Sequence, residues 1–185
     1  MNDCRKIFSF FLASVLFFPW ASSVCFGLPS APIAKSGSVE VEYPNAHTMQ
    51  IKSSDGAILQ YEDFEIGPNE EVHFLQSRAF HRINGNGPSK ILGSIQSNGE
   101  VVLVNTQGIV FGSESRVDAG SLIVSTLDMS KKDFLKKNYQ FLEKTGASIV
   151  SEGFLSSQEG LLALLAPHIQ NLGSIESKFA ILGSG

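Results

Sequence analysis

Three residues near the middle of the chain have side chains that could support chemistry together: Glu114, Arg116 and Asp118. Two carboxylates beside a basic group suit acid–base catalysis, and carboxylates also bind calcium. The same pattern is typical of a solvated corner, which is the interpretation we favour. The four histidines are scattered and lack metal-ligand spacing (His47, His73, His81 and His168). Neither a Gly-x-Ser-x-Gly elbow nor a calcium-binding nonapeptide is present, so we predict no catalytic residue, no metal and no cofactor.

The elements that would position these residues lie in one stretch, residues 98–126, which reads NGEVVLVNTQGIVFGSESRVDAGSLIVST. It holds three apolar runs, Val101–Val104, Ile109–Phe111 and Leu122–Val124, which are too short for helices and rich in β-branched residues. Small or polar corners separate the runs, and their Asn and Gly residues accept a positive φ at little cost. No corner is the two-residue Asn-Gly or Asp-Gly loop of a tight hairpin. The pattern therefore predicts a coil of parallel strands.

The rest of the chain extends this pattern in both directions. Ser38–Tyr43 and Glu71–Leu75 alternate polar and apolar residues, which favours a cap with antiparallel pairs, over about residues 36–80. Phe80–Pro88 is rich in Asn and Gly and is interpreted as a loop. Leu161–Ala166 is apolar without alternation, which indicates burial on both faces or stacked internal ladders. A coil repeat of about 20 residues favours a β-solenoid over the alternative of a β-sandwich, with coils over about residues 88–185.

One segment, near residues 128–142, departs from the coil pattern. Ser130 and Asp133 resemble a capping box, and Phe134 could line one face of a short helix. The lysines of this segment would project outward (Lys131, Lys132, Lys136 and Lys137). They are interpreted as a solvated face, with a contact point for an acidic partner as the alternative.

Residues 1–27 have the pattern of a secretory signal peptide. Arg5 and Lys6 precede an apolar run that is shorter than a membrane span, and small residues follow it. An uncleaved membrane anchor is the alternative. Cleavage would remove both cysteines and leave 12 basic and 17 acidic residues, a formal net charge of −5. The acidic balance and the lack of a basic stripe argue against a nucleic-acid partner.

The stretch NTQGIVFGSESRVDAGSLIVSTLDM resembles the two-partner secretion, or haemagglutination activity, domain of filamentous haemagglutinin-like exoproteins. The motif of that family is Asn-Pro-Asn-Gly-Ile, followed by Phe-Gly and an Asp-x-Gly-x-Leu-x-x-Ser-Thr-Leu run. This chain has Thr106 and Gln107 in place of the Pro and the second Asn. The resemblance covers about residues 36–185, and its matching positions are Asn105, Gly108, Ile109, Phe111, Gly112, Asp118, Gly120, Leu122, Ser125, Thr126 and Leu127.

The resemblance implies an all-β, right-handed parallel β-helix with an N-terminal cap and small extra-helical elements, over residues 28–185. It also implies secretion by an outer-membrane β-barrel transporter with periplasmic domains. The corner formed by Asn105, Thr106, Gln107, Gly108 and Ile109 would serve coil geometry, recognition by the transporter, or both. The bacterial exoprotein would be secreted or surface-bound, with a host-cell or bacterial surface as a further partner. The expected protein is an adhesin or toxin stem, of which this chain would be a fragment. A stand-alone surface adhesin and a carbohydrate-active β-helix protein remain the alternatives.

Overall fold

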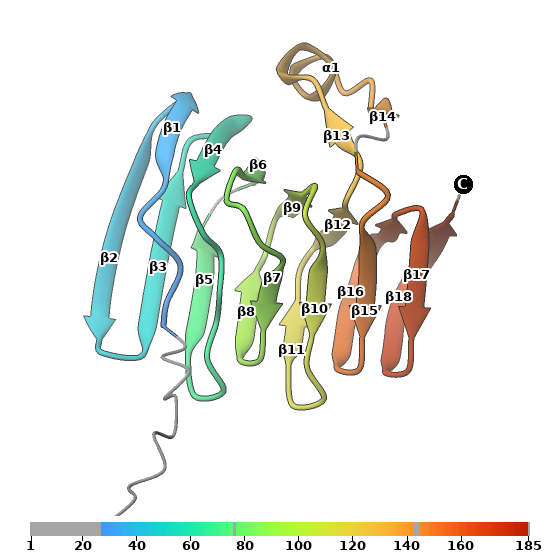
Figure 1. The fold of residues 1–185 in the computed structure, drawn as a ribbon. Helices are drawn as coiled ribbons and strands as arrows, with labels where there is room; N and C mark the ends of the chain where they lie inside the picture. Colours follow the sequence, from blue (N-terminus) through green and yellow to red (C-terminus); the bar gives the residue numbers. More distant parts are fainter. Residues whose placement is uncertain (1–26, 76, 143–144, 185) are drawn as a thin grey trace, which may run out of the picture.

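The computed structural model describes residues 27–75, 77–142 and 145–184, and they form a β-solenoid in which successive coils stack side by side (Figure 1). The predicted signal peptide therefore lies outside the described residues, except for Gly27. Among the described residues, no helix is long and apolar enough to cross a membrane. The prediction of an all-β solenoid is confirmed.

Three ladders of parallel strands make up the solenoid. The first consists of β4 (Ala57–Tyr61), β6 (Arg78–Ile83), β9 (Glu100–Asn105), β12 (Ser121–Ser125), β16 (Phe154–Leu165) and β18 (Ser174–Gly183). The second consists of β3 (Thr48–Ser53), β5 (Glu71–Leu75), β8 (Ser94–Ser97), β11 (Arg116–Asp118) and the first halves of β16 and β18. The third consists of β7 (Ser89–Ile91), β10 (Ile109–Phe111), β15 (Ser148–Ser151) and β17 (His168–Asn171).

The N-terminal end is covered by two strands with antiparallel partners. β1 (Ile33–Ser36) pairs with β4, and β2 (Val39–Asn45) pairs with β3. β2 presents Glu40 and Glu42 to solvent, which suits a strand at the edge of a sheet because charged side chains discourage further pairing. Parallel pairing starts at β3 and β4, earlier than the predicted start of the coils at residue 88.

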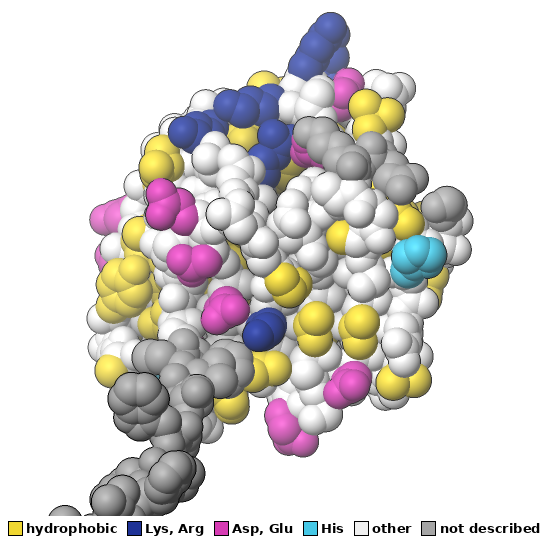
Figure 2. All heavy atoms as spheres, in the orientation of Figure 1, with side chains coloured by type: hydrophobic (Ala, Val, Ile, Leu, Met, Phe, Trp, Pro, Cys, Tyr) yellow, Lys and Arg dark blue, Asp and Glu magenta, His cyan; other side chains and the backbone are white. Residues whose placement is uncertain are grey.

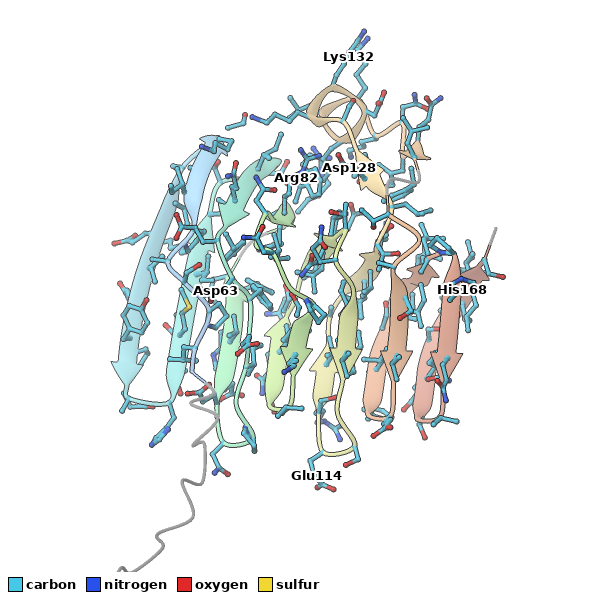
Figure 3. All side chains as sticks on the ribbon, viewed as in Figure 1. Asp63, Arg82, Glu114, Asp128, Lys132 and His168 are labelled. Atoms are coloured by element: carbon cyan, nitrogen blue, oxygen red, sulfur yellow. The ribbon has the colours of Figure 1, made fainter. Side chains whose placement is uncertain are left out.

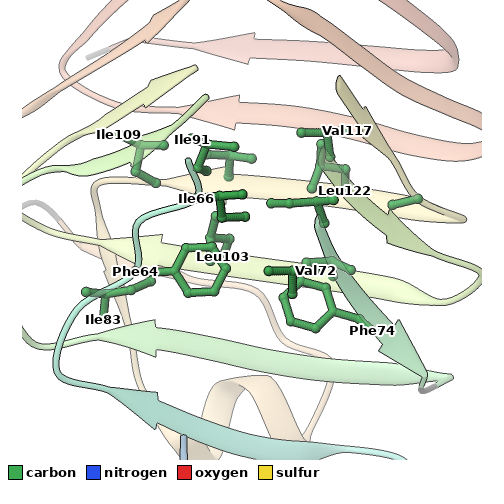
Figure 4. Packing of buried hydrophobic residues seen from close by; sticks show 14 of the residues in the cluster. Phe64, Ile66, Val72, Phe74, Ile83, Ile91, Leu103, Ile109, Val117 and Leu122 are labelled. Carbon is green, nitrogen blue, oxygen red and sulfur yellow. The ribbon is translucent and has the colours of Figure 1, made fainter. Parts of the chain in front are cut away.

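The interior of the solenoid is a continuous apolar core built from the inward side chains of all three ladders (Figure 4). Leu103 shows how it is built, because it lies in register between His81 on β6 and Val124 on β12. Equivalent positions on successive coils thus form lines of side chains, which follows from the strand period of two.

The segment near 128–142 leaves the coil as predicted. It forms a two-stranded pair, β13 (Asp128–Met129) with β14 (Phe141–Leu142), and a short helix, α1 (Lys131–Leu135). Ser130 caps the helix by accepting a hydrogen bond from the Asp133 backbone N–H at 3.1 Å. We call residues 127–147 the excursion. In Figure 1 it lies at the upper edge of the solenoid, beyond β9 and β12.

The prediction of a loop over Phe80–Pro88 is wrong at its start. Phe80–Ile83 belongs to β6, which pairs with β4 and β9. Inward Ala79, His81 and Ile83 are buried in the interior, while outward Phe80 is buried beneath the excursion. The Asn- and Gly-rich composition that suggested a loop is confined to the residues after Ile83.

Candidate functional site

The predicted recognition motif forms the corner between β9 and β10, and its first residue joins two coils. The Asn105 side chain is fully buried. Its Nδ2 donates hydrogen bonds to the Gly87 carbonyl at 3.1 Å and to Ser89 Oγ at 3.0 Å, both on the preceding coil. Its Oδ1 accepts a hydrogen bond from the Gln107 backbone N–H at 2.9 Å, which closes the corner. Asn105 therefore holds the shape of the corner from inside.

The end of the corner is fixed by its backbone conformation and by close packing. Gly108 has a φ of +120°, which L side chains rarely adopt, and it is buried between Pro88 and Ser148 of the adjoining coils. Its carbonyl accepts a hydrogen bond from the Ser89 backbone N–H at 3.0 Å. Ile109 is buried and begins β10.

Thr106 and Gln107 are the two motif residues whose side chains solvent reaches. Thr106 is half-buried and Gln107 is exposed. They line a hollow of about 390 Å³ on the surface, together with Arg82, Asp128 and the loop that contains Asn84 and Asn86. This hollow is polar and lies between the corner and the base of the excursion. A partner of the folded domain would therefore touch Thr106 and Gln107 and not Asn105.

The remaining matched positions before β12 have different environments. Phe111 is buried in the interior, whereas Asp118 projects to solvent from β11. A Cβ at Gly112 would meet Leu92 Cδ2 at 2.6 Å, and one at Gly120 would meet the Asn98 carbonyl oxygen at 2.4 Å. Both glycines thus allow one coil to approach the preceding coil closely.

Ser125 and Thr126 hold the two ends of the excursion to the solenoid. The Ser125 hydroxyl contacts the carbonyls of Leu127 at 3.0 Å and Leu165 at 3.1 Å. The Thr126 hydroxyl donates to the carbonyl of Ala147 at 3.0 Å, where the chain rejoins the coil. Both side chains are buried, so their role in this structure is to close the gap that the excursion makes in the coil.

Two arginines on the outer face of β6 attach the excursion, and the sequence interpretation missed both. Figure 3 shows one of them, Arg82, beside Asp128. Arg82 Nη2 forms an ion pair with Asp128 Oδ1 at 2.6 Å and also donates to the Met129 carbonyl. Arg78 donates to the Phe134 carbonyl at 3.0 Å, and its guanidinium lies 4.4 Å from the centre of the Phe134 ring. The alternation Arg78, Phe80, Arg82 was the available signal, because it places all three side chains on one face of a strand.

The structure does not bring Glu114, Arg116 and Asp118 together at one site. Arg116 and Asp118 project from β11 and border a shallow hollow of about 530 Å³. Glu114 lies in the turn at the lower edge of the solenoid (Figure 3). The Arg116 guanidinium lies 4.6 Å from the centre of the Phe154 ring. Within the described parts of the chain, no three His, Cys, Asp or Glu residues are arranged to hold a metal ion.

His81 is the histidine that lies inside the core. Its Nδ1 is 2.8 Å from the Tyr61 hydroxyl, and both side chains are buried. Burial lowers the pKa of His81 to about 3 and raises the pKa of Tyr61 well above its ordinary value, because each ionised form would lose its hydration. A neutral imidazole in this position packs in the core and hydrogen-bonds Tyr61.

Comparisons with known proteins agree with this arrangement. The model of the family described as TPS secretion domain matches residues 32–185. A heme/hemopexin-binding protein of Haemophilus influenzae is 31% identical over 123 residues, which cover 63% of this chain and 13% of that protein. A heme/hemopexin-binding protein of Haemophilus influenzae strain Rd is 31% identical over 77 residues, which cover 40% of this chain and 8% of that protein. The crystal structure of the HMW1 secretion domain from Haemophilus influenzae superposes with a TM-score of 0.78 at 27% identity, covering 83% of this chain and 44% of that chain. The chain therefore belongs to the family of two-partner secretion domains.

Proposed function

We propose that residues 28–185 are the secretion domain of an adhesin-like exoprotein, recognised by a dedicated outer-membrane β-barrel transporter through its periplasmic domains. In this proposal residues 1–27 are the Sec signal peptide, and the exoprotein reaches the bacterial surface or the medium. Support comes from the family match and from the likeness to the HMW1 secretion domain. The chain spans 13% of the length of the first curated relative, so the heme and hemopexin binding in that protein's name is not assigned to this chain.

The proposal rests on the difference in burial between the residues of the corner. Asn105, Gly108 and Ile109 are buried and hold the corner in place, while Thr106 and Gln107 are presented beside a polar hollow. A catalytic site would instead need converging reactive groups, and the described residues do not bring such groups together at this corner. The corner therefore suits recognition by a partner.

Co-expression with the transporter, scored by release into the medium, tests this proposal. We expect the Thr106→Ala/Gln107→Ala double variant to fold with an unchanged melting temperature and to be released at least about tenfold less, because exposed contacts govern partner binding and not stability. The matched control is Ser113→Ala/Glu114→Ala, in the exposed turn of the same coil at the opposite edge. This control should be released like the wild type.

Two results would contradict the proposal. If no β-barrel transporter releases the wild-type chain, the secretion function is wrong. If the wild type is released and the Thr106→Ala/Gln107→Ala variant is released equally well, the folded corner is not the recognition element. Asn105→Ala is unsuitable as the only test, because it would leave the Gly87 carbonyl and the Gln107 N–H without a partner and weaken the fold.

A further inference from the structure

The excursion carries a dense positive charge on an otherwise acidic chain. Four of the 12 basic residues in 28–185 fall within residues 131–137, and we call them the excursion lysines: Lys131, Lys132, Lys136 and Lys137. All four are exposed. Figure 2 shows Lys and Arg side chains gathered over this end of the molecule, with Asp and Glu mostly over the coils. Residues 131–137 contain one acidic residue, Asp133, whereas 28–185 as a whole carries a formal net charge of −5.

This charge is not neutralised by ion pairs within the described fold. Among the described residues, no carboxylate lies within ion-pair distance of any of the four ammonium groups. Lys131 begins α1, where the partial positive charge of the backbone N–H groups makes a cation unfavourable. Like charges placed so close together repel one another. The excursion lysines are therefore available to an external partner.

The segment that carries the excursion lysines is anchored to the coils. The Phe134 side chain is buried against Phe80 of β6, with ring centres 5.4 Å apart. Arg78 contacts both the ring and the carbonyl of Phe134, and Tyr139 hydrogen-bonds Glu100 on β9. Because this backbone is already anchored, a partner that binds here orders only the lysine side chains and not the segment as well.

The excursion lysines and the exposed part of the corner lie on the same edge of the solenoid. The Thr145 hydroxyl, at the end of the excursion, donates to the Thr106 carbonyl. Arg82 and Asp128, at its base, line the same hollow as Thr106 and Gln107. Figure 3 shows Lys132 above the Arg82–Asp128 pair. One partner can therefore contact the corner, the hollow and the lysines together.

The chemistry of α1 favours a protein over a lipid surface. A helix that binds a membrane interface needs an apolar face directed at the lipid. The apolar side chain of Phe134 points into the protein, and Leu135, 49% exposed, is the one large apolar side chain that α1 leaves in solvent. A small apolar contact surrounded by charges is typical of a protein interface.

We propose that the excursion lysines dock onto an acidic face of the periplasmic domains of the transporter, beside the site of Thr106 and Gln107. This inference rests on the proposed function and adds a second, electrostatic contact to it. The charges steer the domain toward the transporter and fix its orientation, because complementary fields act mainly on the rate and register of association.

The test compares two variants of the full chain that change charge equally at different places. One replaces the excursion lysines (Lys131→Glu, Lys132→Glu, Lys136→Glu and Lys137→Glu). The control replaces four exposed lysines elsewhere (Lys35→Glu, Lys52→Glu, Lys90→Glu and Lys178→Glu). The probes are the purified periplasmic domains of the transporter that releases the wild type, and vesicles containing phosphatidylglycerol. Binding kinetics are measured at about 50 and about 300 mM NaCl, because exposed charges are largely screened at the higher salt.

We expect the excursion variant to bind the periplasmic domains at least about tenfold more weakly at low salt, mostly through slower association. The control should stay within about twofold of the wild type, and all three chains should melt at the same temperature. Equal losses in both variants, no loss in either, or a loss of vesicle binding alone would each overturn the inference. In those cases release of the wild type still supports the proposed function, whereas failure of any transporter to release the wild type would remove both.

Discussion

The molecule has two apolar cores, which differ in how the chain builds them. The inner core lies inside the solenoid and receives side chains from every coil. The outer core lies between one face of the first ladder and the excursion. Its members are Ile58, Phe80, Val102, Val104, Ile123, Met129, Phe134 and Ala163. The inner core is thus a property of the repeat, while the outer core depends on a single inserted segment.

β9 contributes side chains to both cores. Val101 and Leu103 belong to the inner core, while Val102 and Val104 belong to the outer core. The strand is therefore apolar without alternation because both of its faces are covered. β5, in contrast, has a partly solvated outer face and alternates strictly. Runs of continuous apolar residues in this fold mark the coils that an excursion covers.

The largest expected effect comes from breaking the inner core. Leu103→Ala removes a side chain that is 1% exposed and leaves a cavity in a line of stacked residues. We expect the free energy of unfolding to fall by about 3–5 kcal/mol, measured by urea titration. All three ladders should lose hydrogen-exchange protection together. If only the excursion lost protection, the two cores would not be distinct in the way described.

Breaking the outer core should have a local effect. Phe134→Ala removes the buried ring that attaches the excursion. We expect the free energy of local opening of the excursion to fall by about 3 kcal/mol. Hydrogen exchange should show faster exchange in residues 128–142, with the amides of β6 and β9 still protected. Global unfolding of the same size as in Leu103→Ala would contradict this expectation.

Acid should act on the inner core through His81. Its pKa is about 3 in the folded chain, while the imidazole of the unfolded chain takes up a proton below about pH 6.5. The unfolded chain thus binds more protons, so the contribution of His81 to stability is complete above pH 6.5 and falls as the pH drops toward 3. We expect the free energy of unfolding to fall by about 2 kcal/mol between neutral pH and pH 5, measured by urea unfolding across this range.

Two variants separate this effect from general acid instability. His81→Phe should remove the slope between pH 6.5 and pH 5, whatever its effect on stability at neutral pH. His168→Asn changes an exposed histidine of β17 and should leave the slope unchanged. An unaltered slope in His81→Phe would show that other groups cause it.

The smallest effect concerns the cap of α1. Ser130→Ala removes the hydroxyl that accepts from the Asp133 N–H, and we expect a loss of about 1 kcal/mol confined to the excursion. Faster exchange of the Asp133 amide would report it. Ser130→Asp retains an acceptor at this position and should restore protection. A change in the stability of the inner ladders would argue against the independence of the outer core.

The sequence predicted those parts of the fold whose signals are local. β5 was predicted with its observed bounds because its alternation reports one wet face, and the excursion was predicted from Ser130 and the break in the coil rhythm. β6 was missed because its outward residues, Arg78, Phe80 and Arg82, make their contacts with residues about 50 positions later in the chain. The alternation of these residues indicates a strand, but a short window of sequence does not show what covers their face.

The sequence predicted where the corner lies but not which of its side chains are buried. The corner was recognised from its motif, yet nothing in five residues shows which of them face inward. The burial of Asn105 depends on Gly87 and Ser89 of the preceding coil, and the hollow beside Thr106 depends on the Arg82–Asp128 pair. The stacking of coils supplies both, so they became visible only in three dimensions.

The excursion also slows one step in the formation of the coils. Residues paired along the first ladder are separated by 22, 22 and 21 positions from Ala57 to Ala79, Val101 and Leu122, but the next step, from Leu122 to Leu162, spans 40. Nearly doubling the loop adds about 0.6 kcal/mol of closure entropy, or roughly a threefold slower step. A chain that adds coils from its N-terminal end is therefore slowed once, after β12 has paired with β9 and before β15 pairs with β10 and β16 pairs with β12.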